Sequence, residues 1–480
     1  MTTSRVDNTL FFLICQSPLS FFCRISYYNE KVMKLHFYGG ARSVTGANYL
    51  LESHGTKLLI DCGLYQGGRF AERQNFQPFP YAPSEITAVC VTHAHIDHTG
   101  RIPKLYHNGF RGTIYSTPPT RNFAEYLLLD SEHLLEREAE RQRRKPLYSV
   151  EDVKDVMSLW QSVHYHERFH IGPFRITFYD AGHILGSAFI LVEAEGTKII
   201  FSGDLGNSPA PIIRPLESIP STDYCLIESA YGDRLHEDVD KRREQLEDAI
   251  EDTVRAGGTL MIPAFAMERT QELLYHLNEL VEQGRIPRVP VFIDSPLAIK
   301  ITQVYKKYEN YFNKESRDLV RSGDDILNFP GLRMTLTTAQ SKEINEVPPP
   351  KVIIAGSGMS HGGRILHHEQ RYLADPKSMI LFIGYQAEGS MGRRILEGAK
   401  EVRIFHERVP VRCKVRVIHG YSAHADQQQL LDWIAPARHE LRKVFVVQGE
   451  EKASEALARR IRDELAVHAE VPVLGETVVL

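Results

Sequence analysis

Val91-Thr92-His93-Ala94-His95-Ile96-Asp97-His98-Thr99-Gly100 is the stretch that most clearly indicates the fold. The apolar residues before it predict a buried strand that delivers three imidazoles and one carboxylate into a tight loop. Neutral imidazole and carboxylate are ligands that Zn²⁺ prefers, at about 2.0–2.2 Å. His93 and His95 can reach one ion. Asp97 and His98 then turn toward a second ion, which in a two-metal site lies roughly 3.5–4 Å from the first.

Two later segments and one earlier residue add to this motif. His183 lies in a glycine-flanked turn after the predicted strand Phe174–Tyr179. Asp204 lies just past the predicted strand Lys198–Ser202, where its carboxylate can bridge two ions. Asp61 closes a short strand, and we expect it to orient one of the ligand histidines from behind. Turns with Gly and Asp are common, so the prediction depends on all these segments together.

These segments together resemble the metallo-β-lactamase superfamily. The resemblance implies an αββα sandwich with a dinuclear zinc site at its edge. It also implies how the two Zn²⁺ ions share the ligands. His93, His95 and His183 bind the first ion, Asp97 and His98 bind the second, and Asp204 bridges them.

The downstream half narrows the resemblance. After Asp204, short apolar strands such as Tyr224–Glu228 alternate with helices, as in a parallel sheet covered on both faces. Further motifs follow in a fixed order: Leu226–Arg234, Ile262–Phe265, Asp294–Ala298, Gly356–Arg364, Gly384–Gly389 and Gly420–Asp426. This series resembles the β-CASP nucleases, in which an α/β cap domain is inserted into the lactamase-like sandwich. Most members act on RNA, and a smaller branch acts on DNA.

The resemblance implies an α/β protein with an interrupted first domain. We expect the metallo-β-lactamase domain over residues 33–217 and 409–480, and the β-CASP domain over 218–408. Residues 1–32 are expected to be an N-terminal extension, disordered or the product of a mis-assigned start. The apolar residues 10–22 have some features of a signal peptide, but polar residues interrupt them and no small-residue cleavage site follows.

Two further residues take catalytic roles under the resemblance. Glu228 matches the acidic motif A of the family, and His424 matches its motif B histidine. In the family mechanism a zinc-bound hydroxide attacks phosphorus in line, and the motif B histidine protonates the leaving oxygen while the motif A acid holds it. Asp97, Glu228 and His424 are therefore the predicted catalytic set. An imidazole that titrates near neutral pH is a suitable acid for this step.

The glycine-rich loop Gly356–Arg364 is a candidate phosphate-binding site. Ser357, Gly358 and Arg364 could offer hydroxyl, backbone and guanidinium N–H groups to a phosphate. The alternative is a loop that merely turns the chain, as glycine loops often do.

One residue departs from the family pattern. Motif C expects a ligand, usually histidine, in a segment like V-H-G-E, but this chain reads Val447-Gln448-Gly449-Glu450. Gln448 offers a neutral amide oxygen, a poor Zn²⁺ ligand beside imidazole. The second ion would keep Asp97, His98 and the Asp204 bridge. A slower enzyme, a different metal preference or altered chemistry would follow, and we favour an active enzyme.

The bulk composition narrows the environment and the partners. A chain of 480 residues predicts two or three domains, and a formal net charge of −4 argues against binding nucleic acid through a global positive field. Six cysteines without CxxC spacing or disulfide-like density indicate packing residues in a reducing, cytoplasmic location. No segment predicts a membrane span. A homodimer is left open.

The leading interpretation is a zinc ribonuclease that cuts single-stranded RNA endonucleolytically, with 5′ exonuclease action left open. A hydrolase of small thioesters or lactones would not require a cap of nearly 200 residues. A DNA nuclease of the same family remains an alternative. A non-catalytic RNA-binding scaffold, weakened through Gln448, is a third, although Asp204, Glu228 and His424 are all intact.

Overall fold

The structure is a computed structural model that describes residues 32–67, 72–236, 241–387 and 389–480. The predicted N-terminal extension lies outside these ranges, apart from Val32, and so do Cys15 and Cys23. The four cysteines within them are buried and free, as expected of packing residues. None of the helices in these ranges has the length and apolar character needed to cross a bilayer.

The first sheet begins as an antiparallel meander and continues with parallel strands. β1, β2 and β3 pair antiparallel, and β4, β5 and β6 then add in parallel. The seven strands in spatial order are β22 (Thr477–Val479), β1 (Lys34–Gly39), β2 (Asn48–Ser53), β3 (Thr56–Ile60), β4 (Ala88–Cys90), β5 (Thr113–Ser116) and β6 (Trp160–Ser162).

The second sheet has the same mixed character. β7 to β10 form antiparallel pairs, whereas β10, β11, β20 and β21 are parallel to their neighbours. Its seven strands in spatial order are β21 (Ala469–Glu470), β20 (Lys443–Val446), β11 (Tyr224–Ile227), β10 (Thr197–Phe201), β9 (Ala188–Ala194), β8 (Phe174–Asp180) and β7 (Arg168–Ile171).

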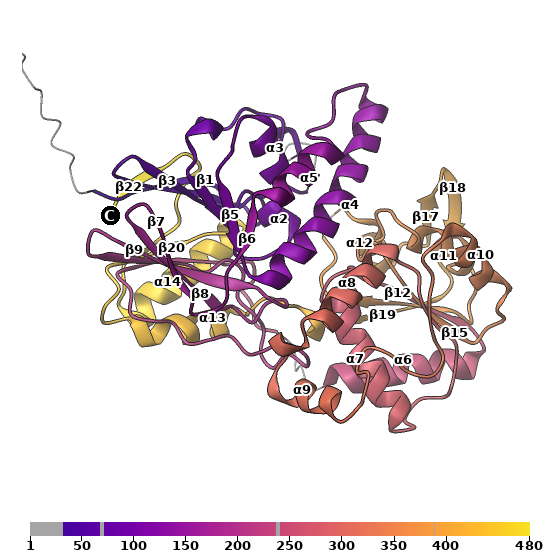
Figure 1. The fold of residues 1–480 in the computed structure, drawn as a ribbon. Coiled ribbons are helices and arrows are strands. Elements are labelled where there is room, and N and C mark those ends of the chain that lie inside the picture. Colours follow the sequence, from indigo (N-terminus) through magenta and orange to yellow (C-terminus); the bar gives the residue numbers. More distant parts are fainter. Residues whose placement is uncertain (1–31, 68–71, 237–240, 388) are drawn as a thin grey trace, which may run out of the picture. The chain divides into compact units, whose positions relative to one another are not determined.

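The two sheets pack face to face, with helices on their outer sides (Figure 1). Leu35 and Leu58 of the first sheet share one buried cluster with Ile190, Ile199 and Phe445 of the second. One apolar cluster joins the first sheet to its helices and continues into the inserted domain, and another joins the second sheet to its helices. The helices are α3 (Ile102–His107), α4 (Pro118–Gln142) and α5 (Val150–Ser158) on the first sheet, and α13 (Gln427–Ile434) and α14 (Glu451–Leu465) on the second. These layers are the predicted αββα sandwich.

The third sheet forms the inserted domain, and all its pairs are parallel. Its six strands in spatial order are β14 (Leu332–Met334), β13 (Val291–Ile293), β15 (Lys351–Ala355), β12 (Thr259–Pro263), β16 (Met379–Ile383) and β19 (Lys414–Ile418). β12, β15 and β16 are buried at every position, as expected of strands covered on both faces.

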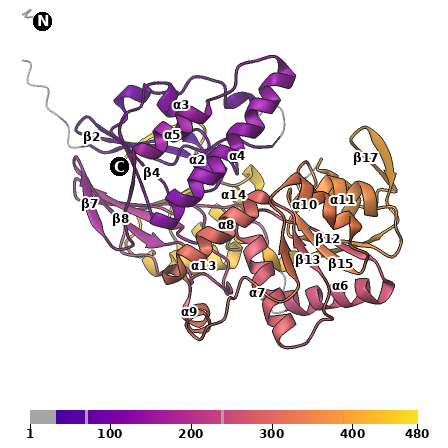
Figure 2. The ribbon, with the colours of Figure 1, turned by 45° about the vertical axis from the view of Figure 1, so that its right-hand side comes forward.

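Helices cover both faces of this third sheet, which Figure 2 shows from a second side. Leu260 and Ile262 of β12 belong to the cluster of the α6–α8 face, whereas Met261 belongs to that of the α11 face. The helices are α6 (Arg242–Ala256), α7 (Arg269–Glu282), α8 (Pro296–Lys307), α11 (Ile365–Tyr372) and α12 (Met391–Leu396). Shorter elements complete the chain: α2 (Ile96–Thr99), α9 (Lys314–Arg321), α10 (Thr338–Glu343), β17 (Glu401–Ile404) and β18 (Glu407–Pro410).

Two strands lie in a different sheet from the one that the sequence predicted. β11, expected in the inserted domain, pairs with β10 and β20 and thus belongs to the second sheet of the sandwich. β19, expected to return to the sandwich, pairs with β16 as the edge of the third sheet. The inserted segment therefore runs from after β11 to the end of β19. A buried parallel strand has the same apolar pattern in either sheet, so the pattern alone does not assign it.

Candidate metal centre

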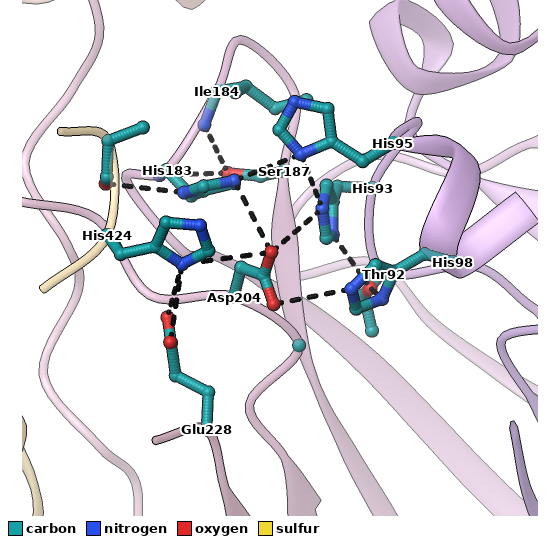
Figure 3. Close-up of polar contacts among 12 residues, drawn as sticks. Thr92, His93, His95, His98, His183, Ile184, Ser187, Asp204, Glu228 and His424 are labelled. Atoms are coloured by element: carbon teal, nitrogen blue, oxygen red, sulfur yellow. Dashed lines mark hydrogen bonds and ion pairs between the residues drawn. The ribbon is translucent and has the colours of Figure 1, made fainter. Parts of the chain in front are cut away.

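Side chains from three strand ends meet at one edge of the sandwich. His93 and His95 follow β4, His183 follows β8, and Asp204 follows β10. Figure 3 shows the four side chains pointing toward one another. One ligand atom from each lies within 4.8 Å of all the others. The structure thus brings together residues that stand more than 100 positions apart in the sequence.

The distances in this cluster fit a tetrahedral zinc ion. His95 Nδ1 lies 3.0 Å from His93 Nε2 and 3.2 Å from His183 Nε2. Asp204 Oδ2 lies 3.3 Å from His93 Nε2 and 3.5 Å from His183 Nε2. Four ligands about 2.0–2.1 Å from a tetrahedral ion are about 3.3–3.4 Å from one another. The four side chains are therefore already spaced to hold one ion.

Hydrogen bonds behind the ligands fix which ring nitrogen faces the cluster. His183 Nδ1 donates to the carbonyl of Ala423 at 3.2 Å, so that Nε2 faces the cluster. His93 Nδ1 lies 3.1 Å from the Thr92 hydroxyl, so that its Nε2 does the same. Ser187 Oγ accepts from the backbone N–H groups of His183 and Ile184 and fixes the turn (Figure 3). Such supporting contacts raise the affinity of a metal site.

Charge and burial keep the ligands in the protonation states that a metal requires. Burial is the main cause that lowers the pKa values of His93, His95 and His183, so these imidazoles are neutral near pH 7. Burial alone would raise the pKa of Asp204, but neighbouring histidines, His98 first among them, hold it well below its usual value. Three neutral imidazoles and one carboxylate form a ligand set suited to Zn²⁺.

The predicted ligands of a second ion lie beside the first group. His98 Nε2 is 3.3 Å from Asp204 Oδ1, and Asp61 Oδ2 is 2.8 Å from His98 Nδ1. Asp97 is half-buried, and burial raises the pKa of its carboxyl. Within the described ranges, Asp97, His98 and Asp204 do not form a group whose ligand atoms all lie within 4.8 Å. Gln448 fills the remaining side, with Nε2 at 2.8 Å from Asp204 Oδ1.

His98 is held differently from the other histidines. Burial lowers its pKa, but Asp204 and Asp61 outweigh this effect and raise the pKa well above the usual value. The Gln448 amide nitrogen lies 3.0 Å from His98 Nε2. Asp61 also accepts from the backbone N–H and the hydroxyl of Thr92, each at 2.8 Å. One carboxylate thus supports both His98 and the start of the ligand loop.

Glu228 and His424 form a pair at the rim of this cluster. His424 Nδ1 lies 3.3 Å from both carboxylate oxygens of Glu228 and 3.9 Å from Asp204 Oδ2. Glu228 is fully buried and also accepts from the backbone N–H of Leu205 at 2.6 Å. Burial raises the pKa of Glu228, and His424 opposes this effect. The two residues predicted to act together are therefore adjacent (Figure 3).

The loop that carries His424 is tied to the sandwich on both sides. Ala425 donates its N–H to Leu205, and Asn207 donates its N–H to Ala423, each at 2.8 Å. His236 Nε2 contacts the carbonyl of His424 at 2.8 Å. The sequence motifs did not single out His236, Asn207 or Thr92, because each acts only through a neighbour that the fold supplies.

The glycine-rich loop is not hydrogen-bonded to the metal cluster in the described part of the chain. Ser357 Oγ accepts from the backbone N–H of His361 at 3.0 Å. Arg364 is engaged elsewhere, because its Nη1 donates to Asp294 at 2.7 Å and its Nη2 donates to the carbonyl of Leu336. The loop leads directly into α11. The Arg364 guanidinium, predicted to bind a phosphate, forms an ion pair with the buried carboxylate of Asp294.

Aromatic and cationic side chains extend from His424 toward the ends of the third sheet. The Tyr231 ring lies 6.0 Å from that of His424, and the Arg234 guanidinium lies 5.5 Å from the Tyr231 ring. Tyr385 is 42% exposed and lies near Arg234. It is one of the groups that raise the pKa of Arg234, whereas burial lowers that pKa. Phe265, 37% exposed, lies two residues after β12, the strand that pairs with β16. Rings next to cations suit unpaired bases.

Three segments of the chain match known protein families. Residues 50–213 match the metallo-beta-lactamase superfamily domain, residues 270–395 match the Beta-Casp domain, and residues 408–472 match the Zn-dependent metallo-hydrolase RNA specificity domain. The matches follow the order of the two predicted domains and include the segment around His424.

Curated relatives resemble the chain over most of its length. A ribonuclease of Thermus thermophilus is 37% identical over 427 residues, which cover 89% of this chain and 95% of the relative. An RNase J-like protein of Methanocaldococcus jannaschii is 32% identical and covers 92% and 98%. The transcription termination factor FttA of Methanosarcina mazei is 31% identical and covers 92% and 70%.

A solved structure shares the fold. A protein of unknown function from Enterococcus faecalis superposes with a TM-score of 0.55 at 12% sequence identity, over 94% of this chain and all of the other. This likeness supports the arrangement of sheets and helices alone.

Proposed function

Because the chain belongs to the β-CASP family of the metallo-β-lactamase superfamily, we propose that its metal centre hydrolyses the phosphodiester bonds of RNA. One observation carries the proposal. A buried acid–histidine pair, Glu228 and His424, stands directly beside a ligand set that fits a single zinc ion. A metal site and a positioned proton donor are the two parts that hydrolysis of a phosphodiester needs.

His93, His95, His183 and Asp204 would hold the zinc ion. Zinc in such a site acts as a Lewis acid and lowers the pKa of water to about 7, which supplies a nucleophile near neutral pH. The remaining residues of the site act on protons and on the substrate.

His424 is placed to give a proton to the leaving oxygen. Its Nδ1 faces Glu228, which leaves Nε2 for the substrate side of a ring that is 22% exposed. Glu228 holds the ring and keeps its charged form favourable, since the carboxylate lies 3.3 Å from Nδ1. The bond from Leu205 N–H fixes the carboxylate in turn. Asp97, half-buried in the same loop as the ligand histidines, completes the proposed catalytic set.

The third sheet offers a surface for the RNA chain. Its strands reverse order between β15 and β12, and ligands of open parallel sheets bind where the order reverses, at the carboxyl ends of the strands. Gly358 packs so closely on Phe265 here that a Cβ atom would lie 2.7 Å from the ring. We retain Ser357 and Gly358 as proposed phosphate contacts. Arg364 is bonded to Asp294, so we do not expect it to be a main contact for phosphate.

The test is cleavage of end-labelled single-stranded RNA and DNA by the full chain with added Zn²⁺. We expect internal cleavage of RNA, and loss of it in His95→Ala and His424→Ala. His439→Ala, at an exposed position, is the matched control and keeps full activity. Tight binding of RNA without any cleavage would support the scaffold alternative instead. A preference for DNA would place the chain in the smaller branch of the family.

A further inference from the structure

Gln448 occupies a confined position behind Asp204. It follows β20, is 2% exposed and has a positive φ of 52°. Its backbone N–H donates to the carbonyl of Gly40 at 2.6 Å, and the side chain lies next to this turn, since a Cβ atom on Gly40 would be 3.2 Å from Gln448 Cγ. With its backbone held in this way, Gln448 directs its side-chain amide toward Asp204 and His98 of the metal cluster.

The amide of Gln448 uses the atoms that a second ion would need. Its nitrogen lies 2.8 Å from Asp204 Oδ1 and 3.0 Å from His98 Nε2. Asp61 Oδ2 lies 2.8 Å from the other ring nitrogen of His98, Nδ1, so Nε2 is the ring atom that faces the amide. An amide nitrogen is a hydrogen-bond donor and has no lone pair for a metal ion. With its nitrogen turned toward the two ligands, the amide occupies their free side by hydrogen-bond contact and does not share an ion with them.

The groups that remain fall short of a second site. With Asp204 Oδ1 and His98 Nε2 engaged by the amide, only the Asp97 carboxylate is left on this side. A structural zinc ion takes four ligands, and a catalytic one takes three from the protein. The amide oxygen of Gln448 would be a weak addition beside imidazole and carboxylate. The residues present fit one ion and do not fit a second.

We propose that Gln448 takes the place of the second metal ion, so that the chain binds a single zinc ion at His93, His95, His183 and Asp204. The inference rests on the proposed function for the identity of the metal. An N–H of the Gln448 amide donates to Asp204 in place of a second cation, and Gln448 becomes a positioning residue that holds Oδ1 while Oδ2 lies beside His93 and His183. The prediction of two Zn²⁺ ions from the family pattern is thereby revised to one.

The test is the metal content of the purified full chain, measured by mass spectrometry after dialysis against low zinc. We expect one zinc ion per chain in the wild type and in Asp97→Asn, and two in Gln448→His. His93→Asn is the control that loses the tightly bound ion. Two ions in the wild type would overturn the proposal. A folded Gln448→His that still holds one ion would show that Gln448 is not the cause.

A second measurement uses the wild type alone and does not depend on the folding of any variant. Manganese-loaded protein should give the resonance spectrum of isolated Mn²⁺. A spin-coupled pair, or X-ray scattering between metals about 3.5–4 Å apart, would overturn the proposal. Neither readout involves RNA, so the failure of the nuclease proposal would leave this result intact, and the reverse also holds.

Discussion

Among single residues, Glu228 has the largest effect in raising the pKa of His424, the proposed proton donor. Burial lowers the pKa of His424, but Glu228 and then Asp204 outweigh it and raise the pKa to about 10. The imidazole is therefore cationic at neutral pH, as a general acid must be. At higher pH it loses the proton, and activity should fall with it.

Replacement of Glu228 by Gln should move this alkaline limit to lower pH. The amide keeps the shape of the side chain but removes the charge that raises the pKa of His424, so the ring loses its proton earlier as the pH rises. The measurement is kcat against pH for Glu228→Gln and wild type. His424→Ala should abolish the fall of kcat at alkaline pH and lower kcat itself about 10²–10⁴-fold. If kcat of Glu228→Gln fell at the same alkaline pH as that of the wild type, this role of Glu228 would be contradicted.

Single residues also show how far sequence reasoning reaches. His93, His95 and His98 could be predicted because three ligand side chains within six positions are rare without a metal. Thr92 and His236 could not, because a hydroxyl or an imidazole behind another side chain has no sequence pattern of its own. Their partners, Asp61 and the carbonyl of His424, become neighbours only in the folded chain.

At the scale of elements, the ends of β12 and β16 present rings to the substrate side. Phe265→Ala and Tyr385→Ala should each weaken the binding of single-stranded RNA, because a stacked base contributes about 1–3 kcal/mol. We therefore expect KM to rise roughly 5–160-fold with little change in kcat. Phe405→Ala, which removes an exposed ring from the β17–β18 hairpin, is the control. An equal effect of all three substitutions would argue against a stacking surface.

The contact between α11 and the glycine-rich loop predicts a dependence of stability on pH. Glu369 is buried, which raises its pKa from 4.5 to about 8, although a bond from the Ser360 hydroxyl opposes the shift. Between these two values the folded chain keeps a proton that the unfolded chain releases. The free energy of unfolding should therefore fall as the pH rises through this window, by up to about 1.4 kcal/mol per unit.

Glu369→Gln removes this proton and should flatten the dependence. The variant should gain stability relative to the wild type from pH 5 to pH 8, as measured by urea unfolding at several pH values. Glu397→Gln, in which an exposed carboxylate is replaced, is the matched control. Parallel profiles for Glu369→Gln and wild type would contradict the prediction.

Elements mark the limit of what the sequence could predict about the fold. The strands β8 and β10 were predicted to within one residue, as Phe174–Tyr179 and Lys198–Ser202, because each is an apolar run between clear turns. β11 and β19 were assigned to the wrong sheet, because strands buried on both faces have no alternating pattern to identify their neighbours. The sheet to which such a strand belongs is known only from its pairing partners, which lie far away in the sequence.

For the whole molecule, a zinc ion bound at the proposed site would join segments that lie far apart in the sequence. The ligands follow β4, β8 and β10, which belong to two different sheets. An ion that binds only the folded chain adds about 4 kcal/mol at a thousand times its Kd. Removal of zinc by a chelator should therefore lower the melting temperature by roughly 4–8 °C.

The control for this effect is a variant without a complete ligand set. His95→Ala should melt near the chelated wild type and should respond little to the chelator, whereas His439→Ala should behave as the wild type. Differential scanning calorimetry with and without chelator measures both. Equal melting temperatures of the wild type with and without chelator would mean that zinc does not link these segments.

The two chain crossings between the sandwich and the cap carry the catalytic pair. Glu228 stands where the chain leaves β11 of the sandwich, and His424 stands where it returns from β19 of the cap. The 3.3 Å contact between His424 and Glu228 therefore joins the two points at which the inserted segment meets the sandwich, so the pair is complete only when both crossings are in place.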